Sequence, residues 1–266
     1  MTNVVLIHGM WHSGNALSPI AEYMSGYSCV IESPTLPDHY RNNQENRYIA
    51  GHSLSNYRDF ILNQPLLGDQ TILIGHGLGG LVAQLVAATT PVKAVILVGS
   101  FGPRGVNHLT PGTVSRNFSR LMSFVYCNRA HRPSWLDAQF SLFNNMNQET
   151  ARWYYDRMCY ESGCAFGESM LWQLDPERSS EVPRDQITCP MLILAGGQDK
   201  LVPPSSSAQI ADYYPNSEYQ LFPRLGHMMF AEPDNEQLFR SIGDFIKSHK
   251  LITKAQAAEE APAMPV

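Results

Sequence analysis

Short apolar runs alternate with amphipathic segments at both ends of this chain. A continuous apolar run of a few residues is typical of a parallel strand that is buried on both faces. The segments between the runs have helical spacing, so the pattern predicts an α/β fold with a mostly parallel, six-stranded sheet flanked by helices. The expected strands are 3–7, 27–31, 71–74, 93–98, 191–195 and 219–222, and the expected helices are 16–24, 53–62, 78–88, 206–214 and 236–248.

The alternation stops in the middle of the chain, where segments of helical character follow one another without a strand. These segments are 113–126, 135–144, 149–160 and 164–174. We therefore expect a core of residues 1–100 and 185–254, with residues 101–184 inserted before the last two strands as a helical lid. Residues 255–266 carry little apolar material, which predicts a flexible tail.

The stretch 71–81 is the point at which a buried strand, an abrupt turn and a helix are predicted to meet. Four of its residues, Gly75, Gly77, Gly79 and Gly80, are glycines. A nucleophile elbow has the pattern G-x-S-x-G at such a junction, because small flanking residues let the chain turn sharply and project the middle side chain. In this chain the middle position is occupied by Gly77 instead of serine.

Three candidate residues follow predicted parallel strands at their carboxyl ends, the edge where open α/β sheets bind ligands. They are Gly77, Asp199 and His227, so the chain order is turn, acid, histidine. A fourth feature, His8-Gly9-Met10-Trp11, follows the first strand. Loop residues at that position can supply a backbone donor to a developing oxyanion.

With the motifs HGMW at 8–11, GHGLGG at 75–80, GGQDKLVP at 196–203 and GHMMFAEP at 226–233, the chain resembles the α/β-hydrolase family. The resemblance covers nearly the whole chain and is closest to small bacterial esterase-like members. It implies that Asp199 orients His227, that His227 is the general base, and that the N–H groups of Met10 and Leu78 hold an oxyanion. A small ester, lactone or thioester would be the substrate.

Four residues are candidates for substrate binding: Trp11, Arg104, Trp135 and Trp172. Aromatic side chains of the lid could line an apolar cavity, although packing of a helical layer onto the sheet explains most of them. Arg104 at the entry to the lid could face a carboxylate or phosphate, or be an exposed hinge residue.

The remaining histidines offer fewer clues. His8 is expected to brace the oxyanion loop, whereas His12, His52 and His76 have no partner that the sequence can name.

Gly77 can be interpreted in three ways. Glycine adopts the strained backbone of an elbow at little cost, so the fold survives but the nucleophile is lost. Loss of the nucleophile in a serine protease costs on the order of 10⁶ in turnover. The otherwise complete set of Asp199, His227 and Met10 favours a hydrolase or acyltransferase that is disabled by the change from serine to glycine. Alternatively, glycine is native and the His227/Asp199 pair acts as a base in lyase, isomerase or cyclase chemistry. A non-catalytic binder of a small molecule is the third interpretation.

A remote alternative is an NADP-binding oxidoreductase of the Rossmann type, because residues 75–80 also satisfy G-x-G-x-x-G. That fingerprint requires an acidic residue about twenty positions further on. Residues 81–136 contain none, although Arg104 could bind a 2′-phosphate.

Composition limits the kinds of molecule that this protein is expected to bind. The net charge of −5 comes without a block of like charge, which argues against binding of nucleic acid or anionic membrane. Five cysteines, an odd number without metal-ligand spacing, predict free thiols and no metal. No apolar run reaches membrane-spanning length. We therefore expect a cytoplasmic protein that acts on a small, apolar acyl compound without a cofactor, and the oligomeric state stays open.

Overall fold

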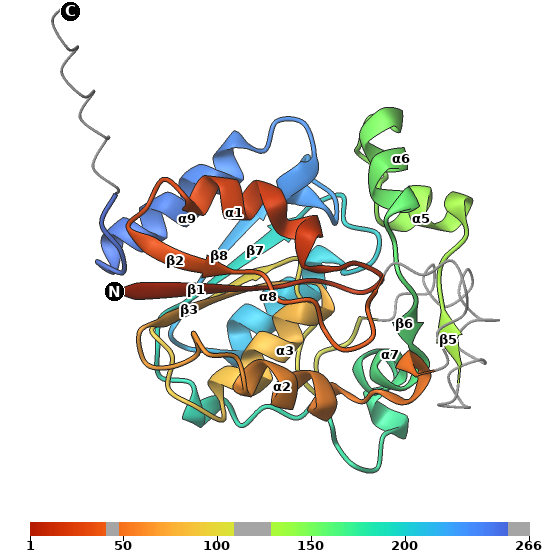
Figure 1. Ribbon diagram of the computed structural model, residues 1–266, viewed down its shortest axis with the longest axis horizontal. Coiled ribbons are helices and arrows are strands. Elements are labelled where there is room, and N and C mark those ends of the chain that lie inside the picture. Colours follow the sequence, from red (N-terminus) through yellow and green to blue (C-terminus); the bar gives the residue numbers. More distant parts are fainter. Residues whose placement is uncertain (41–47, 109–128, 255–266) are drawn as a thin grey trace, which may run out of the picture.

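A six-stranded sheet forms the middle layer of the computed structural model, which describes residues 1–40, 48–108 and 129–254 (Figure 1). Every neighbouring pair of its strands is parallel. The strands are β1 (Thr2–Ile7), β2 (Cys29–Glu32), β3 (Thr71–His76), β4 (Ala94–Val98), β7 (Met191–Gly196) and β8 (Ser217–Phe222), in the spatial order β2-β1-β3-β4-β7-β8. The predicted α/β fold with a parallel sheet of six strands is confirmed.

Helices cover both faces of this sheet. They are α1 (Ser18–Met24), α2 (Leu54–Leu62), α3 (Leu78–Ala87), α8 (Pro204–Tyr213) and α9 (Glu236–Ser248). In Figure 1, α1 and α9 lie on one face, while α2 and α3 lie on the other. The Tyr214 hydroxyl, just after α8, donates to Gln84 of α3, so α8 lies on that second face. Coverage from both sides explains why β3, β4 and β7 are buried throughout, whereas the edge strands β2 and β8 are partly exposed.

Short 3-10 turns complete the connections. They are η1 (Gly14–Leu17), η2 (Ile49–Gly51), η3 (Trp172–Leu174), η4 (Arg184–Gln186) and η5 (Met229–Ala231).

The insertion between β4 and β7 lies beyond the carboxyl ends of the sheet strands (Figure 1). It contains α5 (Trp135–Ser141), α6 (Gln148–Asp156) and α7 (Gly163–Met170), close to three of the predicted helices. The predicted helix 113–126 and the predicted tail 255–266 lie outside the described residues.

The prediction that the insertion has no strand was wrong. β5 (Ala130–His131) and β6 (Glu161–Ser162) form an antiparallel pair. Two residues per strand are too few to leave an alternating pattern in the sequence. The role of residues 101–184 as a lid stays a prediction.

The connectivity of the sheet reverses at β1, which lies between β2 and β3. In open α/β sheets, ligands bind beyond the carboxyl ends of the strands at such a switch point. Here β1 leads into Met10 and β3 leads into Gly77, so both predicted features meet at this edge. The strand order also differs from the order 3-2-1-4-5-6 of Rossmann dinucleotide-binding folds, which argues against the NADP alternative.

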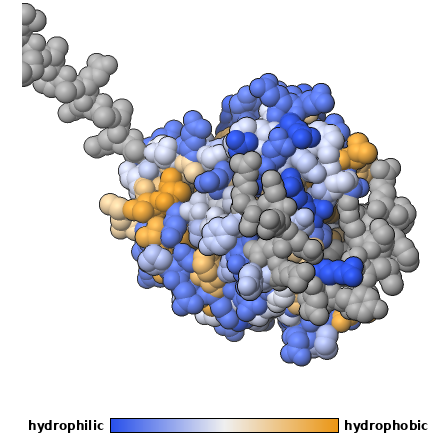
Figure 2. Space-filling model, turned by 45° about the vertical axis from the view of Figure 1, so that its right-hand side comes forward, coloured by the Kyte–Doolittle hydropathy of each residue, from blue (hydrophilic) through white to orange (hydrophobic). Residues whose placement is uncertain are grey.

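Hydrophilic residues predominate on the face shown in Figure 2, and its apolar residues gather in a few separate patches. None of the helices in the described part of the chain is both long and apolar enough to cross a bilayer.

Candidate active site

The turn between β3 and α3 has a backbone conformation that favours glycine. Gly77 has φ 55° and ψ −121°, a region that side chains make costly. Three hydrogen bonds hold it: its N–H donates to the carbonyl of Val98 at 3.1 Å, and its carbonyl accepts from the N–H groups of Gly80 at 3.1 Å and Phe101 at 3.0 Å. The turn is therefore fixed by the neighbouring strand and helix rather than by its own residue.

The flanking glycines allow close packing. A Cβ on Gly79 would lie 2.2 Å from the carbonyl oxygen of Ile7, and one on Gly75 would lie 2.5 Å from that of Gly79. The start of α3 is thus pressed against β1 and β3. This contact accounts for the G-x-G-x-x-G spacing without a nucleotide.

His227 and Asp199 form a buried pair above this turn. Nδ1 of His227 lies 2.9 Å from Oδ2 of Asp199, and the other carboxylate oxygen accepts from the N–H groups of Leu201 and Val202, each at 2.8 Å. A Cβ on Gly77 would lie 3.3 Å from Nε2 of His227. The structure therefore brings together the three residues that the sequence placed on separate strand ends.

Two further side chains hold the loop that contains Gly226 and His227 in place. Nε2 of His76 donates to the carbonyl of His227 at 3.2 Å, and the two rings are 4.6 Å apart. Burial lowers the pKa of His76 well below its ordinary value, so His76 is neutral at neutral pH. Glu232 accepts from the N–H of Gly226 at 2.6 Å. Sequence reasoning left His76 without a partner and did not single out Glu232, although both lie within the quoted motifs.

Histidines also fix both peptide units next to Met10. Nδ1 of His8 donates to the carbonyl of Gly9 at 2.9 Å, and Nδ1 of His12 donates to the carbonyl of Met10 at 2.8 Å. Burial lowers the pKa of His8 to about 3 and that of His12 to about 4, so both rings are neutral at neutral pH. His8 thus contacts the loop, as predicted.

The amide of Met10 is oriented by these contacts. Because C=O and N–H point in opposite directions across a trans peptide, a bonded Gly9 carbonyl turns the Met10 N–H the other way. Gly9 itself borders the turn, since its Cα lies 3.6 Å from the Cβ position of Gly77. Within the described residues, the N–H groups of Met10 and Leu78 donate to no other part of the chain.

The candidate substrate-binding residues have different surroundings. Trp11 follows Met10, is buried, and its ring lies 5.5 Å from that of His131 in the insertion. The Arg104 guanidinium donates to the carbonyl of Asp175 at 3.1 Å and lies 5.3 Å from the ring of Trp172.

Trp172 in turn donates to the carbonyl of Val106 at 3.0 Å, while the ring of Trp135 lies 5.2 Å from that of Tyr155. Arg104, Trp135 and Trp172 therefore contact the insertion and its entry. Substrate binding by any of the four stays a prediction.

Two other features bear on the location of the site. In residues 1–40, 48–108 and 129–254, no cluster of three or more His, Cys, Asp or Glu side chains could hold a metal ion. A groove of about 940 Å³ lies beside α9, lined in part by Tyr23, Tyr27, Arg240 and Lys250, and contains none of the candidate residues. The candidate site lies at the switch point of the sheet, where the candidate side chains meet. The groove beside α9 contains none of these side chains and does not lie at the switch point.

The chain matches the model of the alpha/beta hydrolase family over residues 4–239 and therefore belongs to that family. Among curated proteins it is similar to sn-1-specific diacylglycerol lipase of Mus musculus, with 25% identity over 169 residues. The match covers 60% of this chain and 54% of the lipase, so the chain spans about half the length of this curated relative.

Solved structures confirm the fold. A methylesterase from Arabidopsis superposes with a TM-score of 0.70 at 12% identity, covering 93% of this chain and 100% of the esterase. A monoacylglycerol lipase from Paleococcus ferrophilus gives a TM-score of 0.68 at 19% identity, covering 93% of this chain and 94% of the lipase. At these identities the similarity concerns the fold alone.

Proposed function

We propose that this chain has the active-site architecture of an acyl ester hydrolase, with Gly77 at the nucleophile position, His227 as general base and Asp199 as the residue that orients it. One observation carries the proposal. The Nε2 of His227 lies 3.3 Å from where a Cβ on Gly77 would be, while Nδ1 is bonded to a carboxylate. A serine hydroxyl on that Cβ would lie within hydrogen-bonding reach of Nε2, which is the arrangement that activates a nucleophile.

With serine at position 77, the chemistry follows from this geometry. The hydroxyl oxygen attacks the acyl carbonyl while its proton passes to Nε2 of His227, and Asp199 stabilises the resulting imidazolium. The N–H groups of Met10 and Leu78 donate to the oxyanion. His227 then protonates the leaving alkoxide, and water releases the acyl group by the same steps in reverse order.

With Gly77, no acyl-enzyme can form, so this chain is expected to be inactive or much weakened. Removing triad residues of a serine protease leaves roughly 10³-fold catalysis over water from the oxyanion hole and binding alone. Retention of both His227 and Asp199 counts against a purely binding role, because a receptor needs neither.

A small ester with an apolar acyl group is the proposed substrate class, and lactones and thioesters remain candidates. The printed names of the similar proteins, a methylesterase and two acylglycerol lipases, support an ester. We keep a cytoplasmic location, and action without a cofactor, as part of the proposal.

A second candidate function needs no nucleophile. The imidazole nitrogen that faces Gly77 could take a proton directly from a water or a substrate carbon, as in a lyase, isomerase or cyclase. The lack of a side chain on Gly77 beside His227 Nε2 favours this candidate.

The test is a comparison of Gly77→Ser with Gly77→Ala. Both variants add a Cβ in the same strained backbone, but only serine adds a hydroxyl. We expect Gly77→Ser to hydrolyse p-nitrophenyl esters at least about 10³-fold faster than the Gly77 chain, with a burst of acyl-enzyme formation, and Gly77→Ala to stay at background. No hydrolysis by Gly77→Ser across acyl chain lengths would contradict the proposal.

A further inference from the structure

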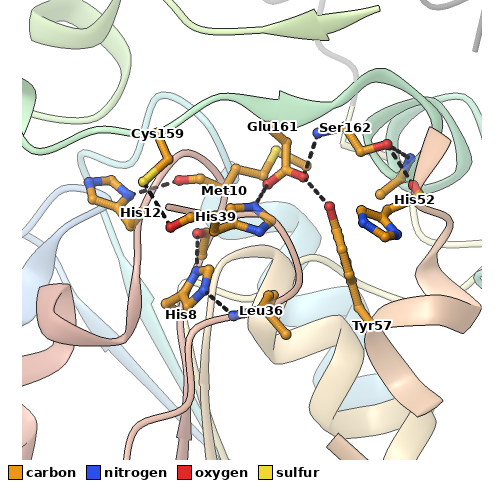
Figure 3. Close-up of polar contacts among 12 residues, drawn as sticks. His8, Met10, His12, Leu36, His39, His52, Tyr57, Cys159, Glu161 and Ser162 are labelled. Carbon is orange, nitrogen blue, oxygen red and sulfur yellow. Dashed lines mark hydrogen bonds and ion pairs between the residues drawn. The ribbon is translucent and has the colours of Figure 1, made fainter. Parts of the chain in front are cut away.

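A second histidine–carboxylate pair lies in the interior next to residues 8–12, which we call the Met10 turn (Figure 3). Nε2 of His39 lies 3.1 Å from Oε2 of Glu161, and both side chains are completely buried. The other oxygen of Glu161 accepts from the hydroxyl of Tyr57 at 2.8 Å and from the N–H of Ser162 at 2.7 Å. Burial raises the pKa of Glu161, but His39 and these hydrogen bonds outweigh it and lower the pKa to about 2. Glu161 is therefore a carboxylate at neutral pH.

His39 carries the matching positive charge. Its Nδ1 lies 3.1 Å from the carbonyl oxygen of Pro37, which can only accept, and its Nε2 faces the carboxylate. Both ring nitrogens therefore donate, as in an imidazolium. Among the described residues, the rings of His8 and Tyr57 lie 4.9 Å and 5.5 Å from the ring of His39, His12 interacts with it electrostatically, and the thiol of Cys159 donates to its carbonyl.

Hydrogen bonds, together with the backbone of Leu36, connect this pair to the Met10 turn. The N–H of His39 donates to the carbonyl of Leu36 at 3.1 Å, which closes residues 36–39 into a turn. The N–H of Leu36 donates to Nε2 of His8 at 3.0 Å, and Nδ1 of His8 donates to the carbonyl of Gly9. The His8 ring can do both only as the neutral tautomer with its proton on Nδ1.

Three distant parts of the chain meet in this network. Glu161 lies on β6 of the insertion, Tyr57 lies on α2, and His39 lies in the loop after β2 (Figure 3). The ion pair therefore ties the insertion to the loop that orients the Gly9–Met10 peptide. A buried pair is costly to disrupt, because removal of one partner leaves the other charge uncompensated.

We propose that the His39–Glu161 ion pair positions the Met10 amide as an oxyanion donor, which makes His39 and Glu161 positioning residues of the active site. The inference rests on the proposed function for the role of Met10. The structural link itself can be tested without any activity.

The first experiment compares Glu161→Gln with Glu168→Gln in the otherwise unchanged chain by ¹H–¹⁵N NMR. Glu168 is a matched control, because it lies on α7 of the same insertion and accepts from the N–H of Leu54 on α2 at 2.7 Å. In the described part of the chain it forms no hydrogen bond with His8, His39, Tyr57 or Glu161, and it acts on Tyr57 only through its charge. We expect Glu161→Gln to shift the Met10 amide and the Nδ1–H of His8, and Glu168→Gln to leave both in place. Unchanged Met10 and His8 signals in Glu161→Gln would overturn the link.

The second experiment measures ester hydrolysis in the Gly77→Ser background. Loss of one oxyanion-hole donor costs about 10²–10³-fold in kcat, so a displaced donor should cost roughly 10- to 100-fold. We expect this loss in kcat for Glu161→Gln with KM changed less than about threefold, and no such loss for Glu168→Gln. If Glu161→Gln does not fold, Tyr57→Phe removes a single hydrogen bond to Glu161 and should give a smaller loss of the same kind.

The outcomes separate the two proposals. A Gly77→Ser chain that is inactive, with a shifted Met10 amide in Glu161→Gln, contradicts the proposed function and leaves the structural link intact. An active Gly77→Ser chain with the same kcat in Glu161→Gln and Glu168→Gln overturns the positioning role.

Discussion

Two buried pairs, His227–Asp199 and His39–Glu161, use the same residue types and differ in what the second imidazole nitrogen meets. In the first pair that nitrogen faces the Cβ position of a glycine at 3.3 Å. In the second pair both nitrogens donate to oxygen atoms of the chain. An imidazole can accept a proton only if one nitrogen has a free lone pair, so only His227 is suited to be a base. His39 is suited to hold neighbouring loops in place.

The carboxylates of the two pairs also differ in the parts of the chain that they contact. Asp199 accepts hydrogen bonds from two amides of its own loop, which follows the carboxyl end of β7. Glu161 joins three distant segments of the chain. The first pair should therefore matter most for catalysis and the second for stability.

The largest expected effect is on turnover. In the Gly77→Ser background, Asp199→Asn should lower kcat by about 10⁴-fold, as the equivalent change does in a serine protease, because the amide stabilises the wrong tautomer of the histidine. Glu161→Gln should lower kcat far less. Ester hydrolysis at saturating substrate measures both, and equal losses would remove the distinction between the pairs.

The next effect is on the free energy of unfolding, for which the His39–Glu161 pair is expected to matter more than it does for turnover. Glu161→Ala should lower the free energy of unfolding by about 3–5 kcal/mol, because it leaves the charge of His39 buried without a partner. Glu181→Ala, which breaks an exposed pair with Arg178, should leave the urea midpoint almost unchanged. A small effect of Glu161→Ala would contradict the role of the buried pair in holding the three segments together.

A smaller cost is expected at the glycine turn. Gly77→Ala should lower the free energy of unfolding by about 1–3 kcal/mol, because a Cβ strains the backbone at φ 55°. Gly68→Ala is the control, since a Cβ there meets nothing within 4 Å and should leave stability unchanged or slightly raised. Urea denaturation measures both changes, and equal effects would show that the turn is not strained.

The last effect concerns pH and is gradual, because it builds up over several pH units. The pKa values of His8 and His12 are lowered by burial to about 3 and about 4, so between the ordinary value of 6.5 and these values only the unfolded chain binds the protons. Their contribution to stability is complete above pH 6.5 and is lost as the pH falls toward 4 and 3. The loss should be at most about 1.4 kcal/mol per pH unit for each histidine.

Urea titrations at several pH values check this, and His12→Gln should flatten the slope. A stability profile that is level between pH 6.5 and 4 would contradict the buried, neutral state of these rings. Glu161 adds to this loss below about pH 4.5. Its pKa is lowered to about 2 in the folded chain, so between pH 4.5 and 2 only the unfolded chain binds the proton, and the stability that Glu161 contributes is lost as the pH falls.

Much of the fold could be predicted because its information is local. Continuous apolar runs such as 93–98 fit only a strand buried on both faces, and β4 is that strand. The two short strands of the insertion could not be predicted, since a two-residue strand exists only through its partner. The start of β8 was missed for a similar reason, because an exposed edge strand lacks the apolar run.

The amino-acid sequence by itself determined which residue types stand at the ends of the parallel strands, and hence the order of Gly77, Asp199 and His227. The tertiary structure alone decided which histidines are paired and how. His39 and Glu161 lie 122 positions apart, and neither follows a predicted sheet strand directly. Periodicity and turn chemistry act over a few residues, whereas a buried ion pair depends on how the whole chain closes around it.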